Sequence, residues 1–150
     1  MRREFSALRR LRHLTAAELI LLIEAQVTLL TCQLARWRRP VGKLVCAGPP
    51  SEPGSADAAS RRSAQAIGWA VSRAARYGCF RPQCLVRSLA VQRMLQRRGS
   101  GIGALRIGVR REHGGLVAHA WVELNGMVIG DDPEHIRTFT PAPDIRLVGL

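Results

Sequence analysis

The spacing of hydrophobic residues changes along the chain, from a helical period near the N-terminus to a strand period near the C-terminus. Before residue 38, apolar side chains recur every three or four residues and share one broad face of a helix: Leu19, Ile20, Ile23, Val27, Leu30 and Leu34. This spacing predicts a helix from about residue 16 to 37, which begins at a capping-box pattern of Thr15 and Glu18. Its apolar face would either pack against the core of the protein or dock on a partner or a membrane surface.

The rest of the chain predicts two further helices and then three strands, at residues 60–77, 84–98, 104–110, 115–124 and 127–131. Gly78 and Gly99 are suited to end the helices, and Asn125-Gly126 is a strong hairpin signal between the last two strands. Prolines near the C-terminus argue against a central strand, so we expect the tail after Pro133 to be irregular. Helices followed by an antiparallel sheet indicate an α+β fold.

Residues 47–59 contain three prolines, two glycines and no large apolar side chain, a composition typical of a linker. We therefore expect an N-terminal helical region (1–46), a flexible linker (47–59) and one compact domain (60–150). The basic and then apolar N-terminus resembles a secretion signal, but Glu18 and Glu24 interrupt the apolar run and no convincing cleavage site follows. We expect a cytoplasmic protein.

The 150 residues carry a formal net charge of +12, and Lys43 is the only lysine. Arginine pairs with carboxylates and phosphates, so acidic peptide, nucleic acid and anionic lipid are the partner classes to consider. The arginines are scattered in pairs along the chain and accompany no motif for binding DNA or RNA. We do not expect nucleic acid as a partner, because an arginine-rich codon bias is the simpler explanation of the charge.

The cysteines, Cys32, Cys46, Cys79 and Cys84, form no Cys-x-x-Cys pair, and the histidines do not cluster, so we expect no metal site. Cys32 and Cys46 fall in the N-terminal region, where a structural role is expected. Cys84 differs, because it follows Pro82-Gln83 and opens the predicted helix at 84–98. Unpaired N–H groups at a helix N-terminus favour the thiolate form of a cysteine. Cys84 is therefore preferred as a nucleophile over Cys79, which lies just outside the helix.

His119 and the Asp131-Asp132 pair complete a pattern with Cys84. His119 lies in a predicted strand between Ala118 and Ala120, which leaves space for its ring to meet another element. A thiol at a helix start, followed by an imidazole and a carboxylate on adjacent strands, is the arrangement that a Cys/His/Asp relay needs. The remaining histidines, His13, His113 and His135, have no such context.

The choice between Asp131 and Asp132 depends on the register of the hairpin. A two-residue Asn-Gly turn pairs 124 with 127 and puts Asp132 opposite His119. A three-residue loop with a glycine bulge pairs 123 with 127 and puts Asp131 opposite His119. Residues directly opposite share a face, so only one aspartate can easily orient the imidazole. The residues themselves leave this choice open.

Three runs resemble a known family: CLVRSLAVQRMLQRRG from Cys84 to Gly99, LRIGVR at 105–110, and AHAWVELNG at 118–126 followed by Asp131. They resemble the transglutaminase-like protease half of the lasso-peptide biosynthesis B protein, over roughly residues 60–140 and more weakly in the N-terminal region. The resemblance implies a transglutaminase-like, papain-like fold with helices packed on an antiparallel sheet. It also implies a leader peptidase, which cuts the leader from a ribosomally made precursor peptide in antibiotic biosynthesis.

Carried over position by position, the resemblance implies that Cys84 is the nucleophile, His119 the general base and acid, and Asp131 the orienting carboxylate. Choosing Asp131 favours the bulged register. The Cys84 backbone N–H and a second donor, Gln83 or Trp69, would hold the oxyanion, although Trp69 suits a core position better. No metal or organic cofactor is implied.

The resemblance also implies partners. They are the precursor peptide, a small leader-recognition protein acting in trans, and the ATP-dependent lasso cyclase that receives the core peptide. A separate recognition protein is expected because residues 1–59 contain only the predicted helix and linker. Two alternatives remain: another acyl-transfer enzyme of the same fold, and a non-catalytic, arginine-rich binding module.

Overall fold

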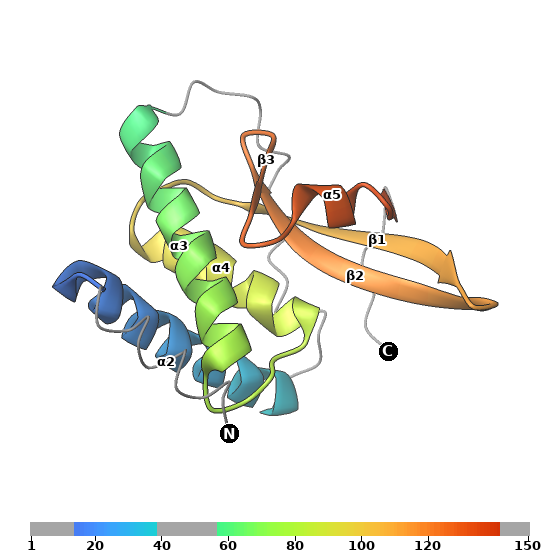
Figure 1. Ribbon diagram of the computed structural model, residues 1–150, viewed down its shortest axis with the longest axis horizontal. Helices are drawn as coiled ribbons and strands as arrows, with labels where there is room; N and C mark the ends of the chain where they lie inside the picture. Colours follow the sequence, from blue (N-terminus) through green and yellow to red (C-terminus); the bar gives the residue numbers. More distant parts are fainter. Residues whose placement is uncertain (1–13, 39–56, 142–150) are drawn as a thin grey trace.

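The structure, a computed structural model, describes residues 14–38 and 57–141 of the 150-residue chain. Helices come first along the chain and an antiparallel sheet follows them (Figure 1). The elements are α2 (Ala16–Arg38), α3 (Ala58–Tyr77), α4 (Cys84–Arg97), β1 (Ala104–Glu112), β2 (Gly115–Leu124), β3 (Met127–Ile129), α5 (Pro133–Ile136) and β4 (Thr140–Pro141). The strands lie in the order β3-β2-β1-β4. The predicted α+β class is therefore confirmed.

Local capping sets where the first two described helices begin. At α2, the Thr15 N–H donates to Glu18 Oε2 (2.8 Å), and the Glu18 N–H donates to Thr15 Oγ1 (3.2 Å), which confirms the predicted capping box. At α3, the carboxylate of Asp57 accepts from the Ser60 N–H at 2.9 Å. α3 therefore begins at Ala58, two residues before the predicted start at residue 60. Residues 47–56 of the predicted linker lie outside the described residues.

The main core lies between the three long helices and one face of the sheet. Its fully buried members include Leu29 of α2, Ile67 of α3, Met94 of α4 and Val122 of β2. α2 is therefore part of the same core as α3 and α4. Burial of these large apolar side chains contributes most of the stability, at roughly 1.5–3 kcal/mol for each.

α2 buries the face opposite to the predicted apolar stripe. Small and medium side chains face α3 and α4, namely Leu21, Ala25, Thr28, Leu29 and Cys32. The predicted stripe is exposed to solvent, from 39% at Leu30 to 63% at Ile20. Of the two alternatives for this stripe, packing against the core formed by residues 14–38 and 57–141 is therefore excluded. Because α2 is apolar on nearly every side, its period alone does not tell which face is buried.

The tail after Pro133 was expected to be irregular, and this expectation was wrong for residues 133–141, the part of the tail that the structure describes. Asp132 caps α5 by accepting from the Glu134 N–H at 3.0 Å, with Pro133 in the first turn, where its missing N–H costs nothing. Ile136 and Phe139 then pack on Trp121, on the face of the sheet away from the main core. β4 follows and pairs with β1 at the edge, which is where a strand tolerates proline.

Candidate active site

His119 lies on β2, on the face that carries Trp121 rather than the face that joins the main core. Its Nε2 lies 2.7 Å from Asp131 Oδ2, a hydrogen bond in which the carboxylate accepts. The side chains are only 14% and 17% exposed. A partly buried carboxylate at this distance fixes the orientation of the ring. With Nε2 engaged, Nδ1 is the nitrogen left to exchange a proton with another group.

Aromatic rings enclose the imidazole on several sides. Phe139 stacks against it, with centroids 5.2 Å apart and planes 28° apart, and Trp121 lies in a parallel offset position at 6.4 Å. His135, which had no supporting context in the sequence, stands edge-on to His119 at 5.3 Å. Gly108 is paired with His119 across the sheet, and a Cβ at Gly108 would come within 2.8 Å of the Trp121 ring. The missing side chain at Gly108 therefore leaves space for this aromatic cluster.

Asp131 reaches His119 by a route that neither predicted register describes. The hairpin has a two-residue turn, with Leu124 paired to Met127 and positive φ angles at Asn125 (51°) and Gly126 (77°). The bulged register was therefore wrong. The unbulged register would place Asp132 opposite His119, but the pairing ends at Ile129.

Gly130 determines which of the two aspartates contacts His119. Its φ of +77° turns the chain out of the strand, so strand alternation no longer applies to Asp131 and Asp132. Asp131 turns to His119, and its other oxygen, Oδ1, accepts from the Asp132 N–H at 2.9 Å. Asp132 serves as the N-cap of α5. The two neighbouring aspartates therefore have separate structural roles.

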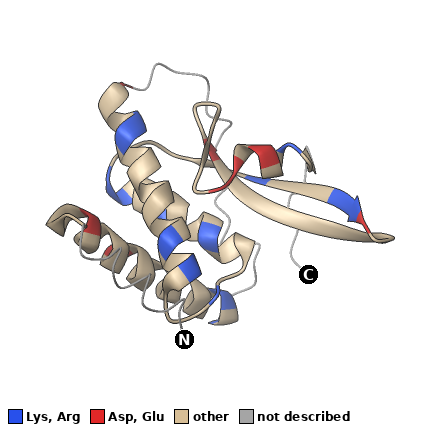
Figure 2. Cartoon of the chain, in the orientation of Figure 1, with Lys and Arg blue, Asp and Glu red and all other residues tan. Residues whose placement is uncertain are grey.

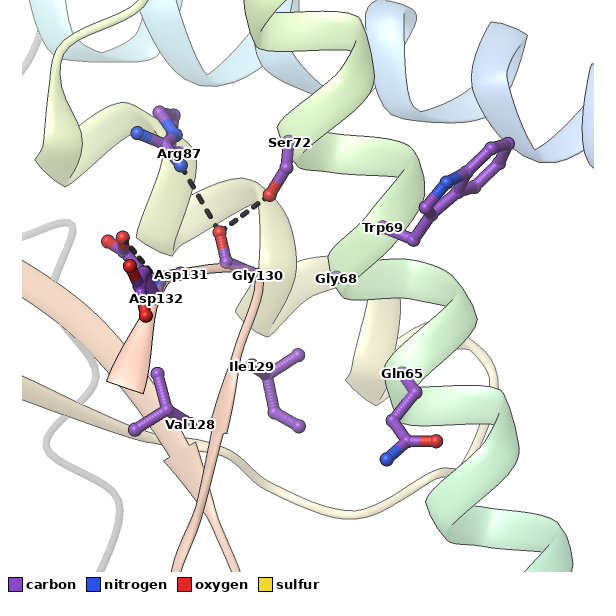
Figure 3. A pocket seen from close by; sticks show the side chains of 10 residues that line it. All are labelled: Gln65, Gly68, Trp69, Ser72, Arg87, Val128, Ile129, Gly130, Asp131 and Asp132. Atoms are coloured by element: carbon purple, nitrogen blue, oxygen red, sulfur yellow. Dashed lines mark hydrogen bonds between the residues drawn. The ribbon is translucent and has the colours of Figure 1, made fainter. Parts of the chain in front are cut away.

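The turn at Gly130 is held by donors from two helices. Ser72 Oγ of α3 donates to the Gly130 carbonyl at 2.6 Å, and Arg87 Nη2 of α4 donates to the same oxygen at 3.1 Å (Figure 3). Gly68 of α3 permits this approach, because a Cβ there would lie 2.6 Å from the Gly130 nitrogen. Sequence reasoning missed Ser72, Arg87 and Gly68 as site residues. Nothing in their local pattern marks them, since their partner is about 40 to 60 residues away.

Cys84 is the first residue of α4 and is partly buried. Gln83, at the N-cap, makes no side-chain capping hydrogen bond, so the first N–H groups of the helix have no cap from this residue. Ser88 Oγ lies 3.0 Å from the Cys84 carbonyl and 2.9 Å from the Ala120 carbonyl. This hydroxyl ties the first turn of α4 to the residue that follows His119.

His119 and Asp131 share a direct hydrogen bond. Cys84 is linked to β2 only through Ser88, whose hydroxyl contacts the carbonyls of Cys84 and Ala120, among the contacts of the described residues. Within residues 14–38 and 57–141, no hydrogen bond connects the Cys84 thiol to the imidazole. Such contacts are often long in free enzymes and shorten when substrate binds. The arrangement has a helix N-terminus with a thiol, an oriented imidazole and a partly buried carboxylate, which are the parts of nucleophilic acyl transfer.

The other cysteines and histidines lie in different surroundings. Cys79 is exposed and accepts from Gln26 Nε2 at 3.3 Å. Cys32 is buried, and burial raises the pKa of its thiol, while nearby Arg93 opposes that rise. His113 is an exposed turn residue with a φ of 48°. Cys46 and His13 lie outside the described residues. The described residues contain no cluster of three or more metal-ligating side chains.

A cavity of about 490 Å³ lies between α3, α4 and the end of β3. Asp131 and Gly130 line one side of it, and Trp69 and Gln65 line the other (Figure 3). The Arg73 guanidinium lies 5.3 Å from the centroid of the Trp69 ring. The cavity reaches Asp131 from the side of α3, so it adjoins the His119–Asp131 pair.

A family model described as the transglutaminase-like superfamily matches residues 27–144. The matched segment begins within α2 and includes Cys84, His119 and Asp131. No similar protein was found among curated proteins or among solved structures.

Proposed function

Because the chain belongs to the transglutaminase-like superfamily, we propose that it is a cysteine peptidase that removes the leader from a lasso-peptide precursor. The observation that carries the proposal is the His119 Nε2–Asp131 Oδ2 hydrogen bond of 2.7 Å, beside a helix that begins at Cys84. Transglutaminase-like enzymes include peptidases and acyltransferases, so the family supports the class of chemistry. The resemblance of residues 84–99 and 118–131 to the lasso-peptide B protein supports the substrate.

In the proposed first step, His119 Nδ1 takes the proton of the Cys84 thiol. Asp131 holds Nε2 and stabilises the imidazolium that forms. The thiolate then attacks the carbonyl carbon of the leader–core bond, and a tetrahedral oxyanion develops. The Cys84 backbone N–H would donate to this oxyanion, together with a second donor from Gln83 or Trp69. The uncapped start of α4 supports the first of these donors.

The second step releases the core peptide. The imidazolium gives its proton to the departing core amine, the carbon–nitrogen bond breaks, and the leader remains as a thioester on Cys84. His119 then removes a proton from water, and the hydroxide attacks the thioester. Collapse of this second intermediate frees the leader carboxylate and restores the thiol. The cycle uses no metal and no organic cofactor.

The proposal includes partners and a place of action. The substrate would be presented by a separate leader-recognition protein, and the product passed to the ATP-dependent cyclase in the cytoplasm. The closest rival is acyl transfer to an amine, which uses the same three side chains and differs only in the acceptor. A binding module that uses only the arginine-rich surface is the rival without catalysis.

An intact-mass assay tests the proposal. Precursor peptide, the leader-recognition protein and the wild-type chain are mixed, alongside Cys84→Ala, His119→Ala and the matched control Cys79→Ala. We expect the wild type and Cys79→Ala to release the leader, and the other two variants to release none. Cleavage that survives in Cys84→Ala would refute the proposed nucleophile. A product joined to an added amine would identify an acyltransferase, and no reaction by the wild type would favour the binding module.

A further inference from the structure

An exposed apolar stripe runs along α2, on the side away from the core. It consists of Leu19, Ile20, Ile23, Val27, Leu30 and Leu34, together with Trp37 near the end of the helix. Trp37 is 73% exposed and Ile20 63% exposed. From Leu19 to Trp37 the stripe spans about 27 Å at the usual helical rise. Soluble surfaces rarely carry so long a continuous apolar patch unless it contacts another molecule.

The stripe lies on a helix that is part of the folded core. α2 is long and apolar enough to cross a membrane by length and composition, with a mean hydropathy of 1.5. Its other face is buried against α3 and α4 through Ala25, Leu29 and Cys32. Spanning a bilayer would remove these side chains from the core. The exposed face of α2 is therefore suited to lie on an apolar surface, while its buried face stays packed against α3 and α4.

The helix that carries the stripe and its two neighbours are positively charged. α2, α3 and α4 together contain nine arginines and only two carboxylates, Glu18 and Glu24. Both carboxylates have partners: Glu18 accepts from the Thr15 cap, and Glu24 forms an ion pair with Arg98. Figure 2 shows basic positions at the C-terminal end of α2 and along α3 and α4. An apolar stripe on a positively charged set of helices is complementary to a layer of acyl chains beneath anionic headgroups.

Two arginines of the neighbouring helices act electrostatically on residues of α2. Hydrogen bonds from Thr15 are the main cause that lowers the pKa of Glu18 at the start of α2, and Arg73 of α3 adds to it. Burial raises the pKa of Cys32, and Arg93 of α4 opposes that rise. Arg73 and Arg93 therefore bring positive charge toward α2 from the two helices that pack on it. Their long stems allow the guanidinium groups to reach headgroups while the stripe enters the acyl region.

A second copy of the chain is a poorer occupant. In a two-fold dimer the same patch meets itself, which brings the positively charged helices of the two copies together. With nine arginines against two engaged carboxylates in these helices, that arrangement is repulsive. We propose that the α2 stripe docks the protein on an anionic lipid surface.

Vesicle co-sedimentation of the full chain tests this docking. Vesicles of phosphatidylglycerol and phosphatidylcholine are compared with vesicles of phosphatidylcholine alone, at low and at high salt. We expect binding to the anionic vesicles, weaker binding at high salt, and little binding to the neutral ones. Ile23→Glu with Val27→Glu should weaken binding at least about tenfold, because two exposed apolar side chains lose their place in the acyl layer.

The matched control is Leu116→Glu with Val117→Glu, which adds the same charge at exposed apolar positions of β2. It should bind almost as wild type does. No binding by the wild type, equal binding to neutral vesicles, or equal loss in both double variants would overturn the proposal. A dimer in sedimentation that Ile23→Glu with Val27→Glu dissociates, without vesicle binding, would assign the stripe to a protein partner instead. None of these readouts depends on leader cleavage.

Tryptophan quenching by brominated anionic lipids gives a second measurement on the wild-type stripe. Trp37 is exposed, whereas Trp121 is only 2% exposed and Trp69 is partly buried. We expect brominated lipid to quench the wild type and to quench Trp37→Phe much less. Quenching that Trp37→Phe leaves unchanged would contradict docking through the stripe.

Discussion

Asp131 and Asp132 are adjacent and chemically identical, yet they make different contacts. Asp131 accepts from the His119 imidazole, and Asp132 accepts from the Glu134 N–H as a helix cap. The left-handed backbone at Gly130 separates the two directions. A carboxylate that orients an imidazole matters to the chemical step, whereas a cap matters to the stability of a short helix.

The two aspartates should therefore respond differently to the same substitution. We expect Asp131→Asn to lower kcat for leader cleavage by roughly 10²- to 10⁴-fold, because the imidazole loses its charged partner. Asp132→Asn should keep nearly full activity, since asparagine is also a good N-cap. Single-turnover cleavage rates measured for both variants check this. Equal losses of kcat would contradict the separate roles.

At the scale of the elements, the contact between α3, α4 and the end of β3 positions the carboxylate of Asp131. Ser72 and Arg87 donate to the Gly130 carbonyl, and Gly68 lets α3 approach it. Ser88 ties α4 to β2 at Ala120. The two helices thereby connect the candidate nucleophile at Cys84 to the strands that carry His119 and Asp131.

Gly130→Ala tests this contact, with Gly99→Ala as its control. Both glycines have positive φ (77° and 61°), so each substitution should cost about 1–2 kcal/mol of the free energy of unfolding. A Cβ at Gly130 would lie 3.3 Å from Gly68, whereas a Cβ at Gly99 would have no neighbour within 4 Å.

We expect Gly130→Ala to lower kcat as well, because Asp131 shifts with the turn, and Gly99→Ala to leave kcat unchanged. Urea unfolding gives the stability change, and cleavage rates give the chemistry. If Gly99→Ala lowered kcat as much as Gly130→Ala, general destabilisation rather than positioning would explain the loss.

For the whole molecule, α2 contributes one side of the core and the exposed stripe. The family match begins within α2, at residue 27, so the helix is continuous with the family's domain. The division into a helical region (1–46), a linker and a domain from residue 60 stays a prediction. Leu29, Ala25 and Cys32 share one buried cluster with α3 and α4.

Burial of Cys32 makes global stability depend on pH. Burial raises the pKa of the thiol in the folded state, so the folded chain keeps the proton at a pH where the unfolded chain releases it. This contribution is complete below the ordinary thiol pKa of about 8.5 and is lost as pH rises above it. We expect the urea midpoint of the wild type to fall between pH 8 and 10 more steeply than that of Cys32→Ala. Parallel pH curves for the two proteins would contradict this.

Several features of the protein follow from the sequence alone, because short-range contacts determine them. Thr15 and Glu18 cap α2, Asn125-Gly126 connects the two strands of a hairpin, and Cys84 opens α4, each as expected. Capping, turn geometry and the hydrophobic period involve residues only a few positions apart. The order of helices and strands, and hence the α+β class, was predictable for the same reason.

Other features were decided only by the tertiary structure. Which face of α2 is buried depends on the shapes of α3 and α4, because the helix is apolar on most sides. The pairing of Asp131 with His119 depends on Gly130, which Ser72 and Arg87 hold from distant parts of the chain. Strand alternation could not predict it, since alternation ends where a left-handed residue leaves the ladder. Long-range packing, rather than local sequence pattern, therefore determines which aspartate contacts His119 and which face of α2 is exposed.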